Sequence, residues 1–419
     1  MKQKILFIAP LPPPVHGSAM VSQYIKDSRV VNEAFDCDFV NLSTSRSMEE
    51  IGKGGIKKLF RFVASYLIVL WKLITHRYSL CYLAITCHGM GFLKDAPFVL
   101  LCKLFCRKVV LHQHNKGLSR DVARWPYRWL MPLVYRNTTV MLLSWHLYED
   151  VASVVKREQV VVCPNGIPEP HPNPLQGERG LGLPDEDTQG AELNVEQTEY
   201  HPAGNCPPNL GVTSEAEGVY SQHSTLNTKQ NAEPRLLFLS NLIESKGIYV
   251  LLEACHMLKE EGIAFQCDYV GGESKMVSGE SFRAAIAAQG LADCVTYHGP
   301  QYGAAKERFF READIFVFPT FYDNECFPLV LVEAMQHKLP VISTMEGAIP
   351  DIVTDGVNGF VCAQRDVQAL AEALRRLIGD GQMRVAMGQR GYEMYREGMT
   401  LEAFEKRFTV ILKSLEFSV

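Results

Sequence analysis

Short apolar runs recur along this chain and are separated by amphipathic stretches, a pattern typical of strands alternating with helices. In the first part of the chain the runs are residues 4–9, 37–41, 107–114, 137–143 and 160–163. Further along they are residues 235–239, 265–270, 295–299, 315–318 and 341–343. This alternation predicts α/β domains with doubly wound parallel sheets.

The alternation stops once, between residues 171 and 232. That stretch is rich in Pro, Gly, Asn, Gln, Thr and Glu, and it lacks sustained helical or strand periodicity. We therefore expect a disordered acidic insertion there, which joins one domain at residues 1–170 to a second at residues 233–400. A total of 419 residues is enough for two domains of ordinary size. The last segment, residues 401–419, has the periodicity of a helix.

Charge is distributed unevenly along the chain. The first 170 residues carry a formal charge of +10 and the remainder −15, which together give −5. Nothing in this balance indicates a nucleic-acid partner, but a basic first half suggests contact with something anionic. The alternative is ordinary variation of the surface. The 12 cysteines form no CxxC pair and many lie in apolar runs, so we expect reduced, buried cysteines in a cytoplasmic protein. The N-terminal apolar run is too short for a signal peptide.

One segment of the first domain, residues 52–77, combines apolar, aromatic and basic residues. Its apolar part is too short to span a bilayer, but a helix of this composition can lie in the membrane surface. Further basic and aromatic patches follow at residues 105–108 and 124–136. We expect peripheral contact with the inner face of the cytoplasmic membrane; the alternative is a set of core helices whose Lys and Arg side chains extend to solvent.

The most informative stretch for chemistry is residues 325–340, ECFPLVLVEAMQHKLP. Pro328 suits the first turn of a helix, and Glu333 is the one acid inside the apolar run that follows. Glu325 precedes the helix, where free N–H groups favour an anion. Two carboxylates and an amide cluster suit the hydroxyls and phosphates of a nucleotide sugar. The alternative is a core helix with two unrelated glutamates.

The longer run from residue 313 to 361 resembles the donor-binding segment of the family 4 glycosyltransferases, which are retaining enzymes with a GT-B fold. The family's paired glutamates match Glu325 and Glu333, its strand–Pro–Thr segment matches residues 315–320, and its later loop matches residues 347–353. The resemblance extends over most of both predicted domains. It implies two Rossmann-like domains that face a cleft, with the C-terminal helix packed back on the first domain.

The resemblance also implies roles for residues around this stretch. Glu325 would bind hydroxyls of the donor sugar, and Glu333 the ribose of the nucleotide. The amides of Cys326 and Phe327 would orient the sugar and the diphosphate. Lys246 would stabilise the charge on the departing diphosphate, which is electrostatic catalysis of a leaving group.

The first domain contributes three residues by the same resemblance. Gly17 keeps one position of a Gly-Gly pair that the family has in its first loop, and His16 takes the place of the other. His114, which follows a predicted strand, would contact the donor sugar near the reacting carbon. His112 is two residues away on the same side of that strand. The alternative for His114 is a histidine of the core, and for Gly17 an ordinary surface turn.

Three further positions belong to the predicted donor side. Asn241 stands where the family has an arginine, so it donates a hydrogen bond but no charge to the diphosphate. Gly272 lies in a turn that would approach the nucleotide, and His298 lies where the family contacts the base.

The sequence therefore predicts a retaining glycosyltransferase that moves a sugar from a nucleoside-diphosphate sugar to a glycan or lipid-linked acceptor hydroxyl. The expected setting is bacterial polysaccharide or lipopolysaccharide assembly. We expect no metal and no other cofactor. One alternative is a nucleotide-sugar epimerase of the same fold, which would act without an acceptor. The other is a non-catalytic scaffold protein. This alternative stays open because Asn241 stands where the family has an arginine.

Overall fold

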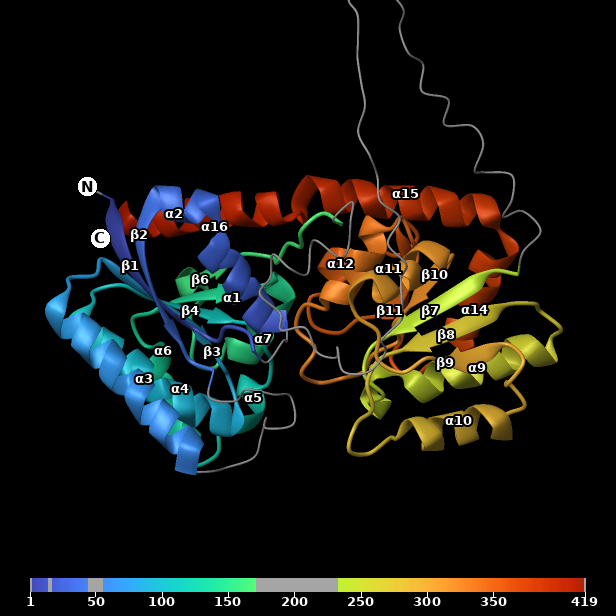
Figure 1. The fold of residues 1–419 in the computed structure, drawn as a ribbon, viewed down its shortest axis with the longest axis horizontal. Coiled ribbons are helices and arrows are strands. Elements are labelled where there is room, and N and C mark those ends of the chain that lie inside the picture. The colour runs from blue at the N-terminus through green and yellow to red at the C-terminus, as the bar shows by residue number, and fades with distance from the viewer. Residues whose placement is uncertain (1, 14–16, 44–55, 171–232, 418–419) are drawn as a thin grey trace, which may run out of the picture.

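Two six-stranded parallel sheets form the framework of the chain (Figure 1). The computed structural model describes residues 2–13, 17–43, 56–170 and 233–417. In spatial order the first sheet contains β2 (Phe35–Asn41), β1 (Gln3–Ala9), β3 (Leu80–Ile85), β4 (Val109–Gln113), β5 (Thr139–Leu142) and β6 (Val160–Val162). The second contains β12 (Gly359–Cys362), β11 (Val341–Thr344), β10 (Ile315–Val317), β7 (Arg235–Leu239), β8 (Gln266–Val270) and β9 (Val295–Tyr297). The prediction of two Rossmann-like domains is confirmed.

Helices connect the strands in both domains. Those of the first domain are α1 (Gly17–Asp27), α2 (Arg29–Ala34), α3 (Ile56–Thr75), α4 (Gly89–Phe105), α5 (Leu118–Asp121), α6 (Tyr127–Tyr135) and α7 (Tyr148–Val151). Those that follow β7 are α9 (Ile248–Glu260), α10 (Gly279–Ala288), α11 (Gly303–Glu312), α12 (Leu329–Gln336), α13 (Ile349–Ile352), α14 (Val367–Gly379), α15 (Gly381–Gly398) and α16 (Leu401–Phe417). Within the described ranges, no helix has the length and apolar character needed to cross a bilayer.

Two strands, β3 and β12, are absent from the sequence-based expectation. All six residues of β3 are buried, so its apolar run has no period-two alternation that would mark it as a strand. The other strand, β12, has only four residues. The predicted insertion at residues 171–232 lies outside the described residues.

The C-terminal helices connect the two domains along one side (Figure 1). α15 contacts α12, and α16 then returns to the first domain, where Phe404, Phe408 and Leu412 pack with Phe7 and other buried residues of the first sheet. The turn that ends the first domain touches the start of α16. A Cβ at Gly166 would lie 2.2 Å from the carbonyl oxygen of Thr400, so only glycine fits there.

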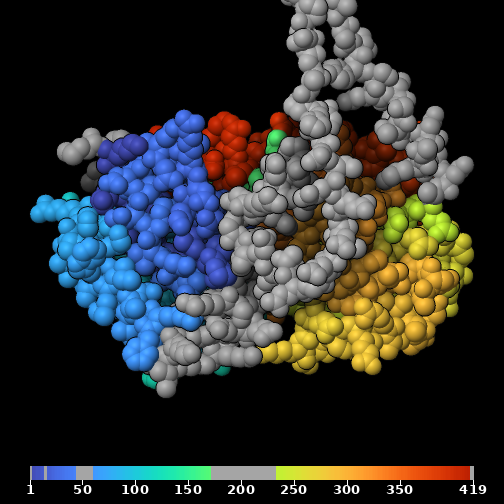
Figure 2. Space-filling view, viewed as in Figure 1, coloured from blue at the N-terminus to red at the C-terminus, as the bar shows by residue number. Residues whose placement is uncertain are grey.

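The order of strands reverses once in each sheet. In the first sheet this switch lies between β1 and β3, and in the second between β7 and β10. Open parallel sheets bind ligands beyond the carboxyl ends of their strands at such a switch. The loops that follow these four strands are therefore where a site is expected. Figure 2 shows the two domains as lobes that lie side by side, with the first domain in blue.

Candidate functional site

A buried ion pair lies at the switch point of the second sheet. Lys246 ends the turn after β7, and Glu325 lies in the loop after β10. The Lys246 Nζ atom is 2.5 Å from Oε2 of Glu325, and the two side chains are only 14% and 10% exposed. The ammonium also lies 4.4 Å from the centroid of the Tyr322 ring. The structure thus brings together two of the predicted catalytic residues, which lie 79 positions apart in sequence.

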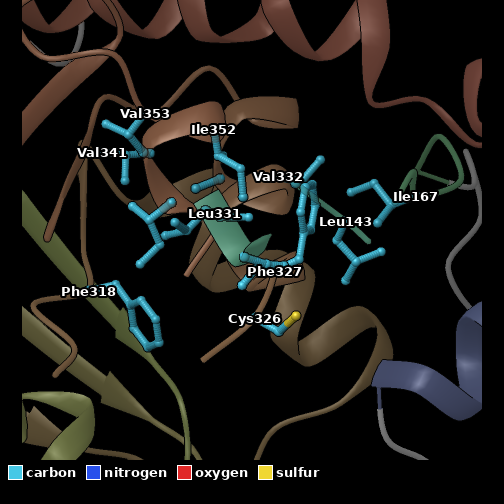
Figure 3. Close-up of a cluster of buried hydrophobic side chains, with 14 of the residues drawn as sticks. Leu143, Ile167, Phe318, Cys326, Phe327, Leu331, Val332, Val341, Ile352 and Val353 are labelled. Atoms are coloured by element: carbon cyan, nitrogen blue, oxygen red, sulfur yellow. The ribbon is translucent and has the colours of Figure 1, made fainter. Parts of the chain in front are cut away.

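The side chains of Cys326 and Phe327 belong to the core. Figure 3 shows both among apolar residues of α12 and of the first domain, including Leu143. Burial raises the pKa of the Cys326 thiol well above its ordinary range, so it is a neutral core group. The two side chains are therefore withdrawn from a ligand, and the use of the two backbone amides stays a prediction.

A second loop packs closely against this segment. Gly347 has a φ of +56°, and a Cβ there would lie 2.4 Å from the carbonyl oxygen of Glu325. The next amide, that of Ala348, donates to the carbonyl of Cys326 at 2.7 Å. The loop after β11 therefore fixes the backbone that carries Glu325.

Glu333 is paired with a cation of the protein. Lys306 of α11 donates to its Oε1 atom at 2.6 Å, and the Glu333 side chain is 25% exposed. Tyr24 of α1 approaches from the first domain: burial first, and then the charge of Glu333, raises the pKa of this phenol to about 12. Both domains thus contribute groups around Glu333.

His114 follows β4 and lies against His112, with their ring centroids 4.0 Å apart. His112 is fully buried and shares a 2.6 Å hydrogen bond with the Tyr82 hydroxyl. Burial and the neighbouring His114 hold the pKa of His112 well below its ordinary value, so it is a neutral core residue. His114 is the partly accessible member of this pair.

Two residues beyond His114, Lys116 reaches across to the second domain. It forms an ion pair with Glu346, which is buried and also accepts a 2.7 Å hydrogen bond from Gln364. Glu346 directly precedes Gly347, so this contact joins the loop after β4 to the loop that packs on Glu325. The loop of His114 is thereby held next to the predicted donor site.

The remaining predicted residues lie in loops at the same edge of the second sheet or outside it. Asn241, after β7, accepts a 3.2 Å hydrogen bond from the Gly272 amide after β8. His298, after β9, has its Nε2 atom 2.7 Å from Asp268, so part of its ring is engaged within the protein. Gly17 begins α1, and a Cβ there would meet open space. His16 lies outside the described residues.

Sequence reasoning did not identify several groups that surround this site: Lys306, Lys116, Glu346 and Tyr24. Each acts through a contact with a residue that is distant in sequence. An acid within an apolar run needs a partner, which can be a cation of the protein or a ligand, and nothing in the sequence indicated Lys306.

Part of the chain resembles known glycosyltransferases in sequence. Residues 222–394 match the family model described as glycosyl transferases group 1. An amylovoran biosynthesis glycosyltransferase, AmsK of Erwinia amylovora, is 36% identical over 148 residues, which cover 34% of this chain and 35% of the relative. The chain thus matches about a third of that relative's length.

Solved structures resemble the chain over nearly its whole length. Sucrose-phosphate synthase from Thermosynechococcus elongatus has a TM-score of 0.66 and 17% identity, with 99% of both chains covered. Anabaena HepE in complex with UDP and glucose has a TM-score of 0.64 and 16% identity, with 98% of this chain and 100% of that chain covered. These similarities confirm the GT-B fold expected from the sequence.

Proposed function

We propose that the chain transfers a sugar from a nucleoside-diphosphate donor to a glycan hydroxyl, with retention at the anomeric carbon, because residues 222–394 match the family model described as glycosyl transferases group 1. The observation that carries this proposal is the Lys246–Glu325 pair, which lies at the switch point of the donor-side sheet and beside loops from the other domain.

In this proposal the pair opens when the donor binds. Lys246 exchanges the Glu325 carboxylate for the diphosphate and stabilises the charge that develops as the leaving group departs. Glu325, released from the lysine, accepts hydrogen bonds from the sugar hydroxyls, while the amides of Cys326 and Phe327 hold the donor in place. Asn241 adds a neutral hydrogen bond. We assign no metal to this step, since Lys246 supplies positive charge at the diphosphate.

Glu333 would accept hydrogen bonds from the ribose, with Lys306 holding its carboxylate in position. Gly272 and His298 would border the base. Across the domain interface, His114 would contact the sugar near the reacting carbon. The solved HepE complex contains UDP and glucose, and AmsK carries a name that assigns it to amylovoran biosynthesis. These names support a nucleotide-sugar donor and a biosynthetic role. The setting that we propose is cell-surface polysaccharide or lipopolysaccharide assembly.

The test is nucleotide release from UDP-, GDP- and ADP-sugars, with and without glycan and lipid-linked acceptors. We expect acceptor-dependent release from one donor, and loss of that release in Glu325→Ala and in Glu333→Ala. Conversion of the donor sugar without acceptor would instead favour an epimerase. Absence of turnover together with nucleotide binding that neither substitution changes would favour a scaffold protein.

The proposed setting is the inner face of the cytoplasmic membrane, because the outer surface of α3 is apolar. The helix buries one face, with Val69 and Leu73 in the core and Tyr66 against the Phe98 ring. The opposite face of α3 is apolar too, although it is exposed. Its exposed apolar side chains are Phe60, Val63, Leu67, Ile68, Trp71 and Ile74. Figure 1 shows α3 at the outer edge of the first domain, away from the second. An apolar face of this kind matches a helix that lies in a membrane surface.

Neighbouring groups extend this face and give it positive charge. Leu104 and Phe105 at the end of α4 are exposed, and Ile74 and Phe105 border a shallow pocket together with Arg77 and Arg107. Each such cation near an anionic surface contributes about 1 kcal/mol to binding. The partner that fits this surface is therefore a bilayer that contains anionic lipid.

Sedimentation with lipid vesicles tests this surface. We expect wild-type protein to bind anionic vesicles, and Leu67→Glu/Trp71→Glu to remain in the supernatant. The control is Val385→Glu on α15, which changes an equally exposed apolar side chain in the other domain. Vesicle binding that survives in the α3 variant would contradict the assignment.

A further inference from the structure

A pocket lies between the first domain and the loop that carries Glu325. Its volume is about 450 Å³. It is lined by His88 after β3, by Arg120 of α5, by Arg124 and Trp125 between α5 and α6, and by Asn324 of the second domain. Asn324 directly precedes Glu325, and His88 follows the strand at which the first sheet switches order. The pocket therefore adjoins the proposed donor site on the side of the first domain.

The wall of this pocket has more positive than negative charge. Arg124 donates to Oδ1 of Asp121 at 3.1 Å, and the other oxygen of that carboxylate accepts from the Gly89 amide at 2.7 Å. Asp121 is thus fully engaged, while the guanidinium of Arg124 keeps most of its five N–H donors. The Asp121 charge balances one of the two arginines of the pocket.

Arg120 is the second cation and bridges the domains. It donates to the amide oxygen of Asn324, a neutral partner, and lies 3.6 Å from the carboxylate of Asp323, which is largely exposed to solvent at the rim. Burial, followed by the charge of Arg120, holds the pKa of His88 below its ordinary value. His88 is therefore a neutral hydrogen-bonding group near pH 7.

An aromatic platform completes the pocket. The Trp125 ring is 78% exposed although it borders the hollow, so its face is available to a ligand. Indole faces suit the flat apolar side of a sugar ring, and arginine forks suit phosphate and carboxylate oxygens.

Building on the function proposed above, we propose that this pocket is the acceptor site and that it selects an anionic sugar. The negative group lies between Arg120 and Arg124, and the sugar ring packs on Trp125. The anionic group is either the phosphate that links a glycan to a lipid or the carboxylate of an acid sugar; both have the oxygen geometry that arginine recognises.

A nearly matched pair of residues provides the control. One turn further along, Arg128 lies over the Trp129 ring at 5.2 Å, and this tryptophan is also highly exposed. Neither residue lines the pocket. The comparison of Arg124 and Trp125 with Arg128 and Trp129 thus separates the pocket from general charge and apolar character of this surface.

Binding is measured by ligand-observed NMR titration with three probes: glucose 1-phosphate, glucuronate and methyl glucoside. We expect at least one charged probe to bind about tenfold more tightly than methyl glucoside. Arg124→Gln should remove that preference, and Trp125→Ala should weaken all three probes. Arg128→Gln and Trp129→Ala should change neither. If wild-type protein prefers glucose 1-phosphate over methyl glucoside, the anionic group is a phosphate. If it prefers glucuronate, the group is a carboxylate.

Lys246→Met provides the control for the donor site. If this variant, and not Arg124→Gln, loses glucose 1-phosphate, the phosphate binds at the donor side and the inference is wrong. Equal affinity of wild type for all three probes also overturns it. These readouts need no turnover, so failure of the transfer assay rejects the proposed function and leaves the pocket to be judged by binding.

Discussion

Removal of Lys246 should destabilise the second domain, because it leaves the Glu325 carboxylate buried without its cation. Breaking a buried pair from one side costs about 3–5 kcal/mol. Both side chains here are still slightly exposed, so we expect about 3 kcal/mol for Lys246→Met. A domain of this size loses about 2–4 °C in Tm per kcal/mol, which gives a decrease of about 6–12 °C.

The double variant Lys246→Met/Glu325→Gln separates stability from activity. Replacing both members of a buried ion pair by uncharged side chains leaves no unpaired charge in the interior. The free energy of unfolding then often changes little. We therefore expect the double variant to recover most of the lost Tm, whereas sugar transfer stays absent in both variants. Thermal unfolding followed by fluorescence and nucleotide release measure the two quantities on the same samples.

The matched control is Lys259→Met. Lys259 pairs with Asp293 at the same 2.5 Å distance as Lys246 with Glu325, but its side chain is 38% exposed and that of Asp293 68%. Solvent screens such a pair, so its loss should shift Tm far less. A Lys246→Met shift no larger than that of Lys259→Met, or a double variant as unstable as the single one, would refute the argument from burial.

Three further predictions concern the loop of Gly347, the contact between α11 and the end of α12, and the absence of a metal from the proposed step. Gly347→Ala should lower activity at least tenfold, measured as nucleotide release, because its Cβ would displace the backbone of Glu325; unchanged activity would show that this backbone is free to move. The hydrogen bond from His337 holds the pKa of Glu307 below its ordinary value. The stability that this contact provides should be complete above pH 4.5 and lost as pH falls through the lowered pKa. Thermal unfolding between pH 3 and 7 should show that loss in wild type, and a Glu307→Gln protein that shows the same loss would contradict it. Finally, nucleotide release should be unaffected by EDTA, and inhibition that Mg²⁺ reverses would show that a metal takes part.

Local pattern determined most of the framework. The alternation of apolar runs with amphipathic stretches predicted ten strands and two doubly wound domains, because the period of side-chain burial is set within each element. It did not identify β3, whose residues are buried on both faces. Strand order, and with it the switch point between β7 and β10, also required the folded structure.

For the candidate site, too, some residues could be predicted from sequence, whereas their contacts required the folded structure. The residues in loops next to apolar runs, such as Glu325 and Lys246, were predicted because motif spacing is local in sequence. Their contact, the Lys306 partner of Glu333 and the Lys116 bridge to Glu346 join residues between 27 and 230 positions apart. Such pairs depend on which loops two separate sheets bring to the same edge. The sequence thus determined which groups the site needs, and tertiary packing decided which side chains supply them.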